Sequence, residues 1–205
     1  MDPDKDESLA ATFFIDCDHR AVREKSRDLV MDIEGAKEKS IRLFYFVRDG
    51  IKYNIYTDRS TEAQFKASHV LDIGQGYCVQ KAILLVALAR AAGIPARLRF
   101  AEIRAYLTPP EMVEKRGTNI FPYHGLVELC INGRWVKATP TYDRLYCEKI
   151  GISPVDFDGE NDAMLPSHAE DGRLNVEYLR DRGSYADLPL EEIRKASVSW
   201  KYLKK

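Results

Sequence analysis

A cysteine follows a glycine-rich turn and directly precedes a long apolar run in the stretch DIGQGYCVQKAILLVALARAAGIPAR, residues 72–97. Gly74 and Gly76 allow a tight turn without hindrance from a Cβ atom, and the apolar residues from Val79 onward predict a buried helix. Cys78 would then lie at the helix N-terminus, where the dipole favours a thiolate nucleophile. A structural buried cysteine is the alternative interpretation, since cysteine is among the most buried residue types.

A cysteine nucleophile needs an imidazole that takes its proton and later protonates the leaving group. The chain has 4 histidines. His124 opens a predicted strand beside a loop, whereas His19, His69 and His168 lie in polar or irregular segments. We therefore expect His124 to be the general base.

The placement of His124 follows from a β-hairpin predicted over HGLVELCINGRWVKAT, residues 124–139. Asn132 and Gly133 are typical of a type I′ turn between two alternating runs. The resulting register places Glu128 opposite Lys137, an oppositely charged pair that supports it. One face of the hairpin is expected in the core: Val127, Leu129, Ile131, Val136 and Ala138.

The other face of the hairpin supplies candidates that could orient the imidazole. His124 lies opposite Thr141, with Thr139 and Asp143 as diagonal neighbours about 7–8 Å away between backbones. Thr139 offers a hydroxyl and Asp143 a carboxylate, and both stay open as the third member of a triad. Trp135 shares this face and is expected to line the cleft.

Acyl transfer also needs hydrogen-bond donors for a developing oxyanion. The backbone N–H of Cys78 is the expected first donor. Gln75 and Gln80 are candidates for the second, and the sequence does not choose between them. A solvated polar side chain is the plainer interpretation of each glutamine.

The elements that must position these residues are helices followed by strands. Two helices are expected within residues 21–55, and a third over 79–92 ends before Gly93, a typical left-handed cap. A strand over 96–107, a loop over 108–123 and the hairpin follow. This order predicts an α+β fold with helices packed on an antiparallel sheet.

The 205 residues suffice for one domain. We expect residues 1–10 to be a flexible lead-in, 11–149 to form the core, and 150–205 to be a C-terminal extension packed on the same domain. A helix is expected from Leu188 onward, with Asp187 as its N-cap.

Composition and charge narrow the class of protein. The chain is 45% hydrophobic and 31% charged with a net charge of −1, which favours neither nucleic acid nor an anionic membrane as partner. No apolar run approaches the roughly 18 residues of a membrane-spanning helix, and the acidic start lacks the features of a secretory signal. We expect a cytoplasmic protein with reduced thiols, no cofactor and no metal site. The acidic segment 156–164 is interpreted as a solvated loop, with weak calcium binding left open.

The segments GQGYCVQKAILLVALARAAGIPARLRF and YHGLVELCINGRWVKATPT resemble the core of the transglutaminase-like superfamily. The resemblance covers roughly residues 36–143, and it implies a papain-like fold with a Cys-His-Asp triad. By this match Cys78 is the nucleophile and His124 the base. Thr139 stands where the family has its aspartate.

The threonine leaves three possibilities. Asp143 reaches back to the imidazole, Thr139 orients it more weakly, or the site is degenerate and the domain is a module that binds a peptide or protein partner. We expect thiol-dependent acyl transfer or hydrolysis on a peptide or carboxamide, by a peptidase, deamidase or transglutaminase-like enzyme. Transfer from a thioester cofactor and the oligomeric state stay open.

Overall fold

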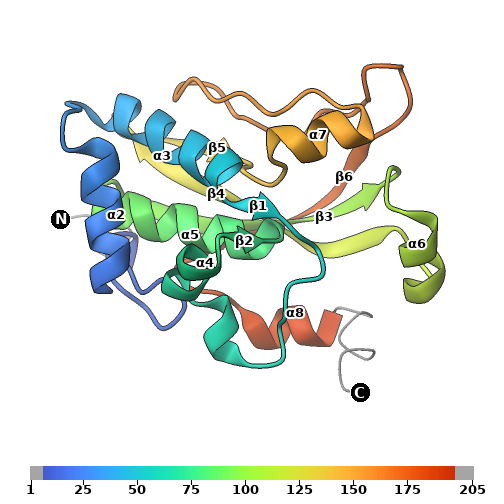
Figure 1. The fold of residues 1–205 in the computed structure, drawn as a ribbon, viewed down its shortest axis with the longest axis horizontal. Helices are drawn as coiled ribbons and strands as arrows, with labels where there is room; N and C mark the ends of the chain where they lie inside the picture. The colour runs from blue at the N-terminus through green and yellow to red at the C-terminus, as the bar shows by residue number, and fades with distance from the viewer. Residues whose placement is uncertain (1–6, 197–205) are drawn as a thin grey trace.

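A computed structural model describes residues 7–196, so the expectations for residues 1–6 and 197–205 lie outside the described residues. Four strands in this range form an antiparallel sheet with the order β5-β4-β3-β6. Helix α5 packs on β4 and β3, and α2, α3 and α4 surround it (Figure 1). This arrangement confirms the α+β, papain-like layout.

The bounds of the elements are as follows. The helices are α2 (Arg20–Val30), α3 (Ala36–Gly50), α4 (Ala67–Ile73), α5 (Cys78–Ala91), α6 (Pro110–Arg116), α7 (Arg144–Ile150) and α8 (Leu190–Ala196), with a short 3₁₀ helix η1 over Glu62–Phe65. The strands of the sheet are β3 (Ala96–Ala105), β4 (Ile120–Ile131), β5 (Arg134–Ala138) and β6 (Val176–Tyr185). A small parallel pair joins β1 (Lys52–Tyr53) to β2 (Gln75–Gly76).

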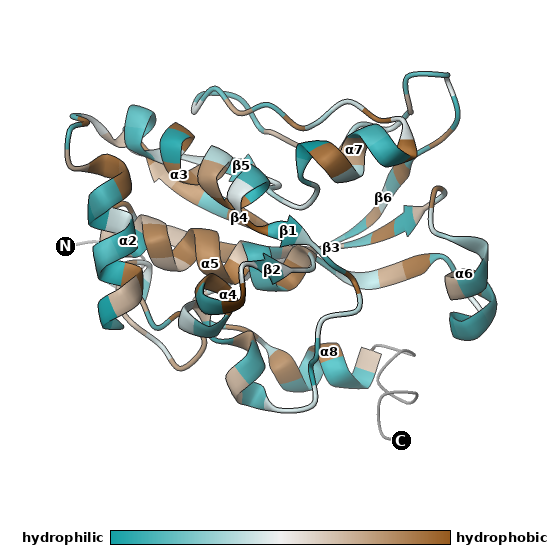
Figure 2. Cartoon of the chain, viewed as in Figure 1, coloured by the Kyte–Doolittle hydropathy of each residue, from teal (hydrophilic) through white to brown (hydrophobic). Residues whose placement is uncertain are grey.

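Helix α5 is the centre of the core. Every residue from Val79 to Arg90 is buried, and α5 is the most uniformly apolar helix in Figure 2. Gly93 has φ 77°, a left-handed conformation that ends the helix without a Cβ penalty. The predicted buried helix is therefore confirmed, with Cys78 as its first residue.

The predicted hairpin register is also confirmed. Ile131 pairs with Arg134 and Glu128 with Lys137. The side chains at the second pair do not meet as expected, because Glu128 forms ion pairs with Arg97 and Arg99, at 2.7 Å each, from the neighbouring strand β3.

The expected loop over 108–123 was wrong. It contains helix α6, with Pro110 in its first turn and Gly117 as a left-handed cap, and strand β4 already begins at Ile120. Proline at the start and glycine after the end are ordinary helix signals. Because α6 is only 7 residues long, it shows no helical periodicity that would have predicted it.

The part of the chain after residue 150 supplies an unexpected strand. β6 pairs antiparallel with β3 from Leu98–Tyr185 to Ala105–Val176. β6 is a half-exposed edge strand in which buried and exposed residues do not alternate strictly. The sequence therefore lacks the alternating pattern that would have predicted a strand here. Helix α8 begins two residues after Leu188, close to the predicted start.

Candidate active site

Cys78 reaches its position through a turn built on glycine. Gly74 ends α4 in a left-handed conformation with φ 63°, and residues 75–76 then pair with β1 as strand β2. The chain enters α5 at Cys78 directly afterwards, so the thiol lies at the helix N-terminus as predicted.

Gly125 lets the histidine strand lie directly against this helix. A Cβ atom on Gly125 would be 2.9 Å from the Cα of Val79 and 3.3 Å from the carbonyl oxygen of Cys78, distances that only glycine tolerates. Because His124 precedes Gly125, the imidazole is carried to the start of α5.

A β-bulge next to His124 bends strand β4. Ala101 pairs with His124 and Ile103 with Phe121, so two steps along β3 match three along β4. Pro122 lies within the bulge and has no N–H to give to the ladder. Bulges of this kind commonly redirect side chains beside functional sites.

Cys78 and His124 line one cavity of about 170 Å³. Its walls are largely apolar and aromatic, and no Asp or Glu is among the described residues that line it. The aromatic lining residues are Tyr53, Tyr56, Tyr77, Phe121, Tyr123, Tyr142 and Tyr146.

This arrangement of a helix-start cysteine and a strand histidine has a counterpart in a known family. The sequence profile of the transglutaminase-like superfamily matches residues 23–140, more than half of the chain. The chain belongs to the transglutaminase-like superfamily. No curated protein matches it.

Solved structures share the fold of this transglutaminase-like domain. A proposed cysteine protease from Cytophaga hutchinsonii is 23% identical with a TM-score of 0.54, covering 73% of this chain and 45% of that one. The periplasmic domain of TgpA from Pseudomonas aeruginosa is 21% identical with a TM-score of 0.51, covering 73% and 51%. The chain thus spans about half the length of these two structures.

The electrostatic environment of Cys78 differs from the sequence expectation. Burial raises the pKa of the thiol, and the backbone N–H groups of Gly125 and Val79 and the charge of Arg59 lower it to a smaller extent. The net shift is upward, so the thiol is protonated at neutral pH. Desolvation outweighs the helix N-terminus here.

His124 is neutral as well. Its side chain is buried, with 3% of the residue exposed, and burial lowers the pKa of the imidazole to about 4. The buried Nε2 atom has no hydrogen-bond partner among the described residues. A neutral imidazole can accept the thiol proton, as a general base must.

Neither candidate third residue hydrogen-bonds to His124 within the described part of the chain. The Thr139 hydroxyl lies 4.0 Å from the sulfur of Met164. The Asp143 carboxylate accepts N–H groups of Tyr53 at 2.6 Å and Tyr146 at 2.9 Å, which caps helix α7.

The register past the end of β5 explains these positions. Pairing with β4 stops at Ala138, and the N–H of Thr139 instead donates to the carbonyl of Ala163 at 2.9 Å. The diagonal positions predicted for Thr139 and Asp143 assume that strand pairing continues beyond Ala138, and it does not.

The two glutamines lie outside the cavity lining. Gln80 is fully buried; its amide N–H donates to the carbonyl of Gln64, and its carbonyl accepts from the Thr57 hydroxyl at 2.7 Å. The carbonyl of Gln75 accepts from Asn54. Neither amide is directed at Cys78 by these contacts, so backbone N–H groups are the better oxyanion donors.

Trp135 does not line the cavity either. It pairs with Cys130 near the hairpin turn, and the guanidinium of Arg97 lies 4.1 Å from its ring centre. The register places Trp135 opposite Cys130, too far along β4 from His124 to line the cavity.

Two hydroxyl residues near the site were given no chemical role by the sequence. The ring of Tyr178 on β6 packs edge-on against His124, with 6.3 Å between ring centres, and burial raises its pKa to about 12 while Leu165 and Thr139 hydrogen bonds lower it. Thr141 lines the cavity with a buried hydroxyl that has no partner in the described residues. The sequence named Thr141 only as the register partner of His124 and did not single out Tyr178.

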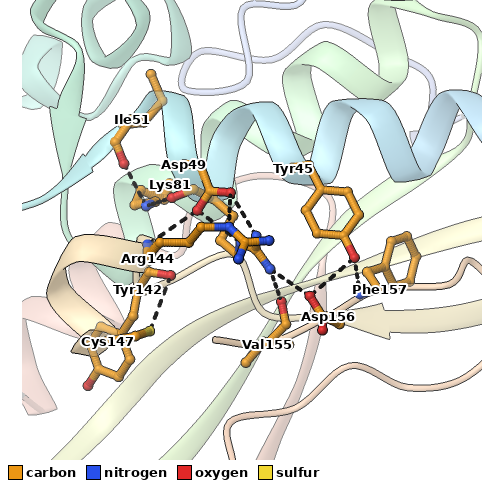
Figure 3. A network of polar contacts seen from close by, with 11 residues as sticks. Tyr45, Asp49, Ile51, Lys81, Tyr142, Arg144, Cys147, Val155, Asp156 and Phe157 are labelled. Atoms are coloured by element: carbon orange, nitrogen blue, oxygen red, sulfur yellow. Dashed lines mark hydrogen bonds and ion pairs between the residues drawn. The ribbon is translucent and has the colours of Figure 1, made fainter. Parts of the chain in front are cut away.

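A buried polar network fixes the helices behind the site (Figure 3). Arg48 is fully buried and pairs with Asp49 at 2.7 Å and Asp156 at 3.0 Å. Lys81 on α5 donates to the carbonyls of Arg48 and Ile51 at 2.9 and 2.7 Å. Burial lowers the pKa of Lys81 to about 7. These contacts join α3 to α5 below Cys78.

Proposed function

We propose that this domain is a cysteine hydrolase or acyltransferase that attacks a peptide or carboxamide carbonyl through Cys78. The observation that supports the proposal is that Cys78, at the start of α5, and His124, on β4, line one small cavity. Membership of the transglutaminase-like superfamily supports the same chemistry.

The neutral resting pair suggests how the reaction begins. His124 takes the thiol proton as the sulfur bonds to the carbonyl carbon, so charge forms only when substrate is present. The oxyanion is placed near the N–H of Cys78, which as a first-turn helix donor has no intrahelical acceptor. Collapse breaks the C–N bond, and the imidazolium gives its proton to the leaving nitrogen. Water or an amine then takes the acyl group.

We propose Thr139 over Asp143 as the residue that positions His124. Thr139 hydrogen-bonds Tyr178, whose ring packs on the imidazole. Asp143 already accepts two backbone N–H groups and caps α7. Thr139 would therefore act through Tyr178, as a positioning residue.

One observation favours a second function. No carboxylate bonds to His124 among the described residues, and burial is the one cause of its shifted pKa. A degenerate domain that uses the same cavity to bind a peptide or protein partner would have this property.

Acylation by an activated ester separates the two functions. The protein is incubated with p-nitrophenyl acetate, and peptide mapping locates the acetyl group in the wild type, Cys78→Ala and His124→Ala. If the protein is an enzyme, Cys78 becomes acetylated, and His124→Ala lowers the rate of acetylation at least a hundredfold. Equal labelling of Cys78 and the buried Cys147, unaffected by His124→Ala, would support the binding module.

The cytoplasmic location is also a proposal. All four cysteines are free thiols, which suits a reducing compartment, and no helix within residues 7–196 is long and apolar enough to cross a membrane. Fractionation of cells that express the protein tests this location.

A further inference from the structure

The cavity beside Cys78 carries positive charge without a matching negative charge. Arg59, Lys115 and Arg116 line it, and the lining within the described residues includes no Asp or Glu. The remaining walls are largely apolar. Such a cavity favours a small organic anion over a neutral or cationic group.

Arg59 has donors left over. One Nη donates to the carbonyl of Ile55 at 2.9 Å, and the guanidinium lies 4.7 Å from the ring centre of Tyr77. Its Nε is buried without a hydrogen-bond partner. The neighbouring Asp58 accepts instead from the N–H of Ser60 at 2.9 Å.

Arg116 has the same incomplete set of contacts. One Nη donates to the carbonyl of Ile120 at 3.0 Å, the guanidinium lies 4.3 Å from the ring centre of Phe121, and its Nε is buried and unpartnered. Burial lowers the pKa of Arg116, and the charge of Arg59 lowers it further. The two guanidinium groups, the arginine pair, thus repel each other inside one cavity.

Other arginines of low exposure use their guanidinium donors within the fold. The buried Arg90 donates to the carbonyls of Ala96, Ala10 and Ala186, and two others pair with carboxylates. Arg48 pairs with Asp49 at 2.7 Å, and Arg99 with Glu128 at 2.7 Å. No ion pair involves the arginine pair within residues 7–196. Arg59 and Arg116 are half-buried, and each has a buried Nε atom without a partner. Their remaining donors therefore point to a negative group that arrives with a ligand.

We propose that the arginine pair binds a free carboxylate that the substrate carries on the residue next to the carbonyl attacked by Cys78. This inference rests on the proposed function and names its substrate class. Guanidinium groups bind carboxylates through paired N–H···O bonds. The cavity of about 170 Å³ is close to the size that encloses one benzene ring. It therefore fits a single terminal residue, as in a peptide with a free C-terminus or an N-acyl amino acid.

The reaction on such a substrate balances without a further reactant. The Cys78 sulfur bonds to the last peptide carbonyl, the C–N bond breaks, and the leaving nitrogen takes the proton that His124 removed from the thiol. The terminal amino acid departs from the arginine pair with its carboxylate. Water then bonds to the thioester carbon, the C–S bond breaks, and the thiol regains its proton.

Two alkylating reagents that differ in one charge test the carboxylate site. Iodoacetate carries a carboxylate and iodoacetamide does not, while both alkylate the same sulfur. We expect the rate ratio of iodoacetate to iodoacetamide at Cys78 to exceed that of a free thiol by about tenfold. Arg59→Gln and Arg116→Gln each lower this ratio toward the free-thiol value, and Arg59→Lys lowers it partly.

Matched controls separate this inference from the fold and from the proposed function. Arg173→Gln removes an exposed guanidinium that pairs with Asp171 outside the cavity and should keep the wild-type ratio. N-acetylglycine, but not its methylamide, should slow alkylation of Cys78 by iodoacetamide.

Three results would overturn the inference. The first is a wild-type ratio of iodoacetate to iodoacetamide rates equal to that of a free thiol, while His124-dependent acetylation persists. It would refute the carboxylate site but not the proposed enzymatic function. Protection by inorganic phosphate but not by N-acetylglycine shows a different anion. If wild-type Cys78 shows no His124-dependent acetylation, both the proposed function and the substrate class are refuted.

Discussion

Gly125 and Val79 lie so close that a Cβ atom on the glycine would be 2.9 Å from the Cα of the valine. Val79 follows Cys78 on α5, and Gly125 follows His124 on β4. The backbones of the two elements therefore meet at the residues next to the proposed nucleophile and base. This contact, rather than a side-chain bond, sets the distance between the thiol and the imidazole.

Gly125→Ala is therefore expected to separate Cys78 from His124. The added methyl group must push β4 away from α5, and a displacement near 1 Å can lower a rate about a hundredfold. Overpacking should also lower the free energy of unfolding by about 1–3 kcal/mol. Acetylation kinetics and urea unfolding measure both effects.

Gly172→Ala is the control for Gly125→Ala. Gly172 has φ +84° but open space around its Cβ position, so its replacement strains the backbone at a residue that does not line the cavity. It should lower stability while acetylation of Cys78 continues at the wild-type rate. An unchanged rate in Gly125→Ala would show that the close approach does not position the pair.

The acid limb of the pH–rate profile should lie near pH 4. His124 must be neutral to accept the thiol proton, and its pKa is lowered to about 4. Acetylation of Cys78 should therefore persist below pH 6 and fall only as pH drops through about 4. A profile that falls near pH 6.5, the ordinary histidine value, would contradict a buried, desolvated imidazole.

The same shift makes stability depend on pH. His124 binds a proton more weakly in the folded state than in the unfolded state. Its contribution to the free energy of unfolding is therefore fully present above pH 6.5 and is lost as pH falls toward 4. Between pH 7 and 4.5 the loss should be about 2–3 kcal/mol. His124→Gln should remove this part of the pH dependence, measured by urea unfolding. Replacement of the exposed His168 by Gln should leave the wild-type slope, and an equal loss in both variants would refute the assignment.

Strand β6 is expected to be essential for folding. It pairs with β3 from Leu98 to Ala105, so a chain that ends at residue 174 would expose that edge to solvent and to other chains. We expect this chain to lose cooperative unfolding and to aggregate, whereas one that ends at residue 196 keeps both the sheet and α8. Circular dichroism and light scattering distinguish the two. A well-folded chain that ends at residue 174 would show that β6 and α8 are dispensable for folding.

The sequence predicted those parts of the site that depend on local patterns. Three local patterns each sufficed to predict an element: the turn at Gly74, the apolar run of α5 and the Asn132-Gly133 turn. Together they predicted the positions of Cys78 and His124. The residue that positions His124 could not be predicted, because its place depends on where the chain turns after Ala138. That turn follows a long-range hydrogen bond from Thr139 to Ala163.

The arginine pair was missed for a related reason. Arg59 lies before η1 and Arg116 at the end of α6, separated in sequence from Cys78 and from each other. Neither belongs to a periodic pattern. Only tertiary packing shows that both guanidinium groups enter the same cavity.

Replacement of Thr139 and Asp143 should separate positioning from stability. Thr139→Val keeps the shape but removes the hydroxyl that bonds Tyr178, so acetylation of Cys78 should slow by about three- to tenfold with a small change in unfolding. Asp143→Asn weakens the cap of α7 and the bond to the Tyr53 N–H, which should lower the free energy of unfolding by about 1 kcal/mol. Thr139→Val should also be less than additive with Tyr178→Phe, since both remove one interaction. If Asp143→Asn instead slows acetylation more than Thr139→Val does, without loss of stability, the carboxylate positions His124 and the threonine does not.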